Sequence, residues 1–131
     1  MEGGLQPDEL QERLKRATIL KNEGHYDEAL VELRAILEVA PDDVEARVVL
    51  GLVLGFTGDF DASLEELKRA ATDNPDSLSA RLNLAKTYAM LGMYEEAKAE
   101  FLEVLRLSPE HKEAIKQLSY FKSLECGESD S

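Results

Sequence analysis

Glycine and proline return at a fixed step of 34 residues along this chain of 131 residues. The step links Gly24, Gly58 and Gly92, and it links the four prolines at positions 7, 41, 75 and 109 in the same way. Self-similarity at this period is typical of repeat proteins, in which each unit packs on its neighbours. The chain is therefore expected to fold as three copies of one small unit, at about residues 10–43, 44–77 and 78–111.

Each unit is expected to contain two antiparallel helices around its glycine. In the first unit, residues 8–23 precede Gly24, and residues 26–40 carry apolar side chains three and four positions apart before Pro41 ends the second helix. A glycine at this place often ends a helix with a positive φ. Asp42 or Asp43 and, one unit later, Ser77 are candidate N-caps of the helices that follow.

Small side chains recur at one position in each predicted helix. They are Ala17, Gly51 and Ala85 in the first helices and Ala29, Ser63 and Ala97 in the second helices. We expect the two helices of each pair to approach one another most closely at these positions.

The ends of the chain are expected to differ from the repeats. Residues 1–7 are predicted to be disordered, and residues 125–131 form a small acidic tail that is also predicted to be disordered. Between the third unit and this tail, one further helix fits residues 110–124. Lys112 and Lys122 stand where the third unit has apolar residues, so this helix is expected to cap the stack with polar surface. The folded domain would then span residues 8–124.

Charge and hydropathy exclude several classes of partner. The net charge of −12 disfavours nucleic acid and anionic membrane surfaces. The longest apolar run, residues 48–56, is far shorter than the roughly 20 residues that a membrane span needs. The first ten residues lack the pattern of a secretory signal, which predicts a cytoplasmic protein. The single cysteine, Cys126, cannot form an internal disulfide and is expected to be an inert thiol.

Catalytic, cofactor-binding and metal-binding patterns are not found in the sequence. The only histidines, His25 and His111, fall in different units, and no pair of cysteines offers a zinc site. There is no glycine-rich phosphate loop and no nucleophile motif. We therefore predict that the chain is not an enzyme and binds no cofactor or metal.

The pattern resembles the tetratricopeptide repeat family, whose units follow W-x2-L-G-x2-Y, A-x3-F and P over 34 residues. The third unit carries the resemblance in Leu84, Ala85, Tyr88, Ala97, Phe101 and Pro109, and the other two units align with it in register. The resemblance implies an all-α, right-handed superhelical solenoid of three helix-turn-helix units with a capping helix. Arginine (Arg13, Arg47, Arg81) stands where the family often has tryptophan, and we expect its aliphatic stem to cover apolar surface while its charge stays in water.

The resemblance also implies a concave groove lined by the first helices, which binds a peptide or helix of a partner. The implied lining is Leu14, Thr18, Lys21, Asn22, Val48, Leu52, Gly55, Phe56, Leu82, Asn83, Lys86 and Met90. Gly55 would leave a notch for a ligand backbone. The alternative for Val48, Leu52 and Leu82 is packing against the neighbouring helix.

One specialised ligand of the family is not expected here. Some members hold the C-terminal carboxylate of a chaperone with a clamp of lysine, arginine and asparagine. The corresponding positions are Leu14, Thr18, Val49, Ser79 and Asn83, and none carries a cation. A C-terminal chaperone tail is therefore not predicted as the ligand.

These observations predict a non-enzymatic protein-interaction module. The acids concentrate in the second helices, so the first helices are neutral to slightly basic and would suit an apolar segment with some acidic residues. Two alternatives stay open. A second copy of the chain could cover the groove or the end helix, giving a homo-oligomer, or the protein could be a small acidic chaperone that holds a secreted client.

Overall fold

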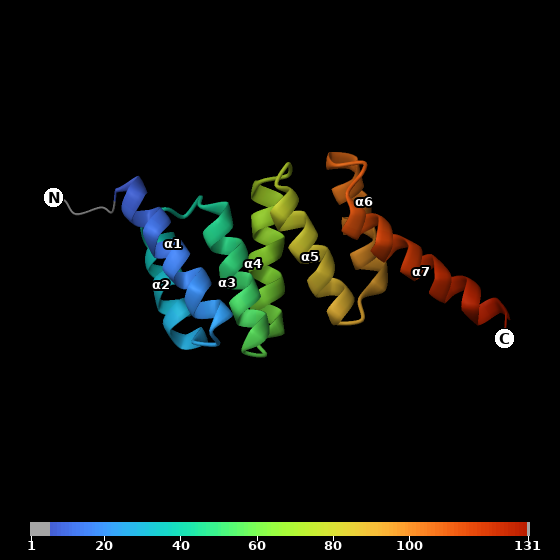
Figure 1. The fold of residues 1–131 in the computed structure, drawn as a ribbon, viewed down its shortest axis with the longest axis horizontal. Helices are drawn as coiled ribbons and strands as arrows, with labels where there is room; N and C mark the ends of the chain where they lie inside the picture. Colours follow the sequence, from blue (N-terminus) through green and yellow to red (C-terminus); the bar gives the residue numbers. More distant parts are fainter. Residues whose placement is uncertain (1–5, 131) are drawn as a thin grey trace. The chain divides into compact units, whose positions relative to one another are not determined.

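Seven helices make up the described part of the chain. The computed structural model describes the backbone of residues 6–130 and the side chains of residues 6–124, and it contains no strand there. The helices are α1 (Pro7–Asn22), α2 (Tyr26–Val39), α3 (Val44–Phe56), α4 (Phe60–Asp73), α5 (Leu78–Met90), α6 (Tyr94–Leu107) and α7 (Lys112–Asp130), as labelled in Figure 1. The predicted all-α class with paired helices is confirmed.

The residues divide into two compact units, one up to Ala70 and one from Ala71. The first unit holds α1, α2, α3 and most of α4, and the second holds α5, α6 and α7. The right-handed superhelix and the single domain over residues 8–124 stay predictions, because both depend on how the two units are placed.

Both ends of the helical region differ from the predicted bounds. α1 begins at Pro7, where proline suits the first helical turn, and the backbone N–H of Gln6 donates to the Glu9 carboxylate at 2.8 Å. Residues 1–5, for which disorder was predicted, lie outside the described residues. α7 begins at Lys112 and continues to Asp130, beyond the predicted end near Leu124. Residues 125–130 contain no proline and only one glycine, so no residue there forces the helix to stop.

The three glycines end the first helix of each pair in the same way. Their φ angles are 83°, 90° and 78° for Gly24, Gly58 and Gly92, as predicted. In the first pair, the N–H of His25 donates to the Leu20 carbonyl at 2.8 Å. Equivalent bonds of 2.9 Å recur one and two repeats later. This reversal bonds the last carbonyls of the helix and turns the chain back against it.

The helices α3, α5 and α7 each start at an N-cap residue, and these three residues are 34 positions apart. The Asp43 carboxylate accepts from the N–H of Ala46 at 3.0 Å, and the Ser77 hydroxyl accepts from the N–H of Ala80 at 3.1 Å. Both caps were among those predicted. At the equivalent place before α7, Nδ1 of His111 accepts from the N–H of Ala114 at 3.2 Å. His111 therefore has a structural role at a helix start, which the sequence analysis did not foresee.

Small residues sit in the contacts between paired helices. In the first unit, Ala17 and Ala29 are fully buried in one core with Leu33, Ile36 and Val53. In the second unit, Ala85 and Ala97 are fully buried, as is Phe101. The predicted close approach of the helices at these positions agrees with this burial.

α3 and α4 approach closely at Gly51. The Ser63 hydroxyl donates to the Gly51 carbonyl at 2.7 Å, and a Cβ added to Gly51 would lie 2.7 Å from Cγ of Leu67. Because Leu67 is fully buried, it has little room to move away. Glycine is therefore required here for space, although it has a low helix propensity.

An arginine–glutamate pair joins the two helices of every repeat. Arg47 Nη1 donates to the Glu66 carboxylate at 2.6 Å, and Nη2 donates to the Pro41 carbonyl at 2.8 Å. Arg81 Nη1 and Glu100 repeat the pair at 2.9 Å. In the first repeat, Arg13 and Glu32 lie 3.7 Å apart.

The prediction that these arginine charges stay in water is wrong for Arg47. Its side chain is only 8% exposed, against 36% for Arg13, and its guanidinium is bonded to protein acceptors. The sequence analysis missed this because the partner, Glu66, lies on the second helix of the pair.

Replacing Arg47 by alanine should lower the free energy of unfolding by about 2–3 kcal/mol, since it leaves a partly buried carboxylate and a carbonyl without their donor. Arg13→Ala should cost less than about 1 kcal/mol, because its ion pair is longer and more exposed. Urea denaturation followed by circular dichroism measures both. Equal losses for the two variants would show that burial of the Arg47 pair does not matter.

Gly51→Ala should destabilise the fold by about 1–2 kcal/mol, because the overlap with Leu67 outweighs the roughly 1 kcal/mol gained in helix propensity. The matched control is Gly55→Ala in the same helix, whose Cβ would meet only Ser63 Oγ, at 3.3 Å. That control should be neutral or stabilising by up to about 1 kcal/mol. Thermal unfolding of the two variants would contradict this account if both fell alike.

Candidate functional site

The predicted groove residues are divided between the two units. Eight of them lie on α1 and α3 in the first unit, and four lie on α5 in the second. Each group belongs to a candidate surface of its own unit.

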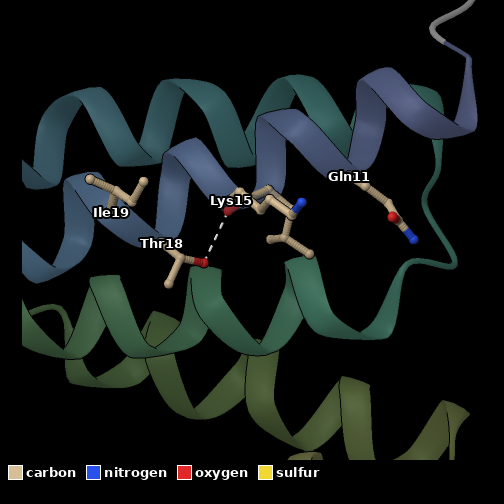
Figure 2. A pocket seen from close by; sticks show the side chains of 5 residues that line it. Gln11, Lys15, Thr18 and Ile19 are labelled. Carbon is tan, nitrogen blue, oxygen red and sulfur yellow. Dashed lines mark hydrogen bonds between the residues drawn. The ribbon is translucent and has the colours of Figure 1, made fainter.

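The first surface runs along α1. A cavity of about 500 Å³ lies against Gln11, Leu14, Lys15, Thr18 and Ile19. In Figure 2 the labelled side chains follow one another along this helix. The Thr18 hydroxyl donates to the Leu14 carbonyl of its own helix at 2.9 Å, so its polar group is satisfied and its methyl is left for apolar contact. We call these five residues the α1 surface.

Two members of the α1 surface, Leu14 and Thr18, were predicted as groove residues. Leu14 also packs against the core of the first unit, so only part of its side chain is available. Ile19 was not predicted, although it is 55% exposed and is the most prominent apolar side chain of this surface. In the sequence, Ile19 lies one position after Thr18, which the family resemblance places in the groove. The resemblance therefore does not select Ile19 itself.

Two predicted groove residues of α3 face the protein itself. Val48 is buried, at 2% exposure, which agrees with the packing alternative. A Cβ at Gly55 would point towards Ser63 on α4, at 3.3 Å from its hydroxyl oxygen. The side of Gly55 that lacks a Cβ atom therefore faces α4. The space left by the missing side chain is not the predicted notch for a ligand backbone.

Phe56, at the end of α3, is held by an aromatic contact. Its ring stacks on Tyr26 of α2 with centroids 5.6 Å apart and an interplanar angle of 24°. Phe56 is nevertheless more than half exposed. It therefore presents an apolar ring in a defined orientation.

The second surface is a cavity of about 350 Å³ within the second unit. It is lined by Lys86, Ala89, Met90, Tyr94, Phe101, Gln117, Tyr120 and Phe121, which come from α5, α6 and α7. We call it the aromatic pocket. Of the predicted groove residues, Lys86 and Met90 belong to it. The other two, Leu82 and Asn83, are half-buried, and the Asn83 amide donates to the Ser79 carbonyl of its own helix at 2.9 Å.

The capping helix takes part in this pocket. Lys112 and Lys122 are exposed, as predicted, but so are the apolar side chains of Ile115 and Tyr120. The cap therefore presents polar surface at the two lysines together with apolar side chains that were not predicted to be exposed.

Catalytic chemistry finds no support in the described residues. No three His, Cys, Asp or Glu side chains come together there as a metal site. Burial, with the nearby charges of Glu100 and Glu96, raises the pKa of the Tyr88 phenol, which is further favoured in its neutral form. Within the same part of the chain, no helix has the length and apolarity to cross a bilayer.

Comparison with protein families identifies the repeats. Three family models, each described as tetratricopeptide repeat, match residues 10–53, 44–69 and 57–119. The chain belongs to the tetratricopeptide repeat family. No curated protein matches it closely enough to be reported as a relative.

Solved structures of other proteins have a similar fold. The first such domain of human RPAP3, determined by NMR, is 19% identical with a TM-score of 0.83, covering 96% of this chain and 99% of that one. The first such domain of Spaghetti (RPAP3), solved with the HSP90 peptide SRMEEVD, is 18% identical with a TM-score of 0.82, covering 95% and 99%. The Yersinia enterocolitica type III secretion translocator chaperone SycD, in an alternative dimer, is 18% identical with a TM-score of 0.79, covering 94% and 96%.

The stack of Phe56 on Tyr26 can be measured by a double-mutant cycle. Phe56→Ala and Tyr26→Ala should each destabilise the fold, and the double variant should cost about 0.5–1.5 kcal/mol less than the sum of the two. Denaturant unfolding of the four proteins gives this coupling. Simple additivity would mean that the two rings do not support one another.

Proposed function

We propose that this tetratricopeptide repeat protein is a non-enzymatic, cytoplasmic interaction module that binds an apolar peptide or helix of a partner protein. The first helices, α1 and α3 in one unit and α5 in the other, supply the contacts. The observation that carries this proposal is the α1 surface, because an open cavity there lies beside the exposed side chain of Ile19.

The chemistry of the α1 surface favours an apolar segment. Leu14, Ile19 and the methyl of Thr18 offer aliphatic contact, and Lys15 and Gln11 supply polar groups at the same cavity. Apolar area surrounded by polar groups is the usual anatomy of a protein-binding patch. A partner that buries Ile19 would gain hydrophobic free energy that the isolated chain leaves unused.

The ligand is expected to differ from a chaperone C-terminus. The RPAP3 domain was solved with the HSP90 peptide SRMEEVD, and that similarity supports peptide binding as a class. In this chain Leu14, Thr18, Val49, Ser79 and Asn83 stand at the clamp positions, so no cation is there to pair with a terminal carboxylate. We therefore propose an internal apolar segment rather than a free C-terminus.

Self-association is the second candidate, and Ile19 favours it too, because an exposed aliphatic side chain can also be covered by another copy. A holding chaperone for an apolar client is a special case of the first candidate, and the similarity in fold to the SycD chaperone is compatible with it.

Ile19→Asp should abolish partner binding, since it places a charge in the apolar cavity, while Val31→Asp should leave it intact. Val31 is the matched control, because it is a β-branched, exposed side chain in the same unit but on α2. The measurement is co-purification from lysate with a photo-crosslinking residue at position 15, followed by mapping of the crosslinked peptide by mass spectrometry.

The crosslinked segment should be rich in aliphatic residues and absent from the Ile19→Asp sample. Retention of the same partner by both variants would refute the α1 surface as the site. A crosslink to this chain itself, with a mass by light scattering that rises with concentration, would replace the first candidate by self-association.

A further inference from the structure

We propose that the aromatic pocket of the second unit accepts one aromatic or branched aliphatic side chain from a partner segment whose flanking residues are acidic. This inference rests on the proposed function and specifies the chemistry of the ligand at a second surface. Three helices of one unit build the pocket, so it does not depend on how the two units are placed.

Phe121 organises the inner wall of the pocket. Its ring lies 6.0 Å from that of Phe101 and 5.6 Å from that of Tyr94, both tilted at 49°, and 6.2 Å from that of Tyr120. Phe101 is fully buried and Phe121 nearly so. Packed rings from three directions fix the wall, which makes it a preformed apolar site.

The outer edge of the pocket is open and adaptable. Met90, Tyr94 and Tyr120 all line the cavity, yet each is more than half exposed, with Met90 at 70%. Methionine adjusts to irregular shapes, and tyrosine combines an apolar ring with a polar tip, so both are favoured at binding surfaces. A cavity of about 350 Å³ is at the small end of ligand sites, which suits one large side chain rather than a whole helix.

The charge around the pocket runs against that of the whole protein. The chain carries a net charge of −12. Of the three helices that line the pocket, α5 has two bases and no acid, α6 has two bases and four glutamates, and α7 up to Leu124 has three lysines and one glutamate, so together they carry a net charge of +2. Lys86 lies in the lining and reaches the carboxylate of Glu113 at 3.3 Å, with both side chains about half exposed. Lys116 lies one helical turn before Tyr120, on the same side of α7.

The acids of the neighbouring helix are partly occupied. On α6, the Glu100 carboxylate pairs with Arg81 at 2.9 Å, and that of Glu103 pairs with Arg106 at 3.0 Å. Arg81 is one of the two bases of α5, so the positive charge beside the pocket comes from Lys86, which also pairs with Glu113, and from Lys116. Charge complementarity favours a partner with acidic residues beside its apolar anchor, and it would act mainly on association rate and specificity.

A peptide selection tests the proposal with the full chain. A random twelve-residue library on phage is panned against the wild type, Tyr120→Ser and Ile115→Ser. Ile115 is the matched control, because it is an exposed apolar residue of α7 that does not line the pocket. The wild type and Ile115→Ser should enrich peptides with an aromatic or branched aliphatic residue next to Asp or Glu, and Tyr120→Ser should enrich them at least tenfold less.

The site is then located by NMR with methyl-labelled methionine. The most enriched peptide should shift the methyl of Met90 more than that of Met93, and the shift should vanish in Tyr120→Ser. Lys116→Glu, or replacement of the peptide's acids by glutamine, should weaken binding at least threefold. An unmoved Met90, peptides without acids, equal binding by Tyr120→Ser or no enrichment would each overturn the inference.

The two proposals fail independently. If the pocket fails these tests while Ile19→Asp still abolishes partner binding, the interaction module stands and only the ligand of the aromatic pocket is wrong. If peptides bind the pocket while Ile19→Asp has no effect, the α1 surface is wrong and binding belongs to the second unit.

Discussion

The fold depends on how closely the two helices of each repeat can approach. At Gly51 the helices are so near that even a methyl group would overlap Leu67, and the Ser63 hydroxyl bonds directly to the Gly51 carbonyl. Alanine pairs allow a similar contact in the other repeats. Because each pair is only two helices thick, its core is small, and a shift of one helix would expose apolar residues on both.

The arginine–glutamate pairs add a second constraint to the same contact. Each pair joins the first helix to the second within one repeat, at a position where the family often uses tryptophan. Tryptophan would fill this space with apolar area alone, whereas arginine covers it with its stem and also bonds across the gap. The arginine side chain is 36% exposed in the first repeat and 8% exposed in the second, and the distance falls from 3.7 Å to 2.6 Å. Pairs with the same sequence spacing therefore differ in strength along the chain.

Two groups of apolar side chains line cavities on the packed repeats. The α1 surface is aliphatic and lies on one helix, while the aromatic pocket is assembled from three helices around Phe121.

The order of the helices, most of their ends and the family followed from the sequence, because glycine with positive φ, proline and N-caps act on their immediate neighbours. The end of α7 at Asp130 did not follow. Gly24, Asp43 and Ser77 did what their residue types predict. The contacts and burial of four residues did not follow from the sequence, because each depends on a partner far along the chain or on the burial of its surroundings. These residues are Arg47, Val48, Gly55 and Tyr120. Local rules therefore determined where most helices begin and end. Tertiary packing alone decided which side chains form the core and which remain exposed, because burial is a property of the whole packed unit.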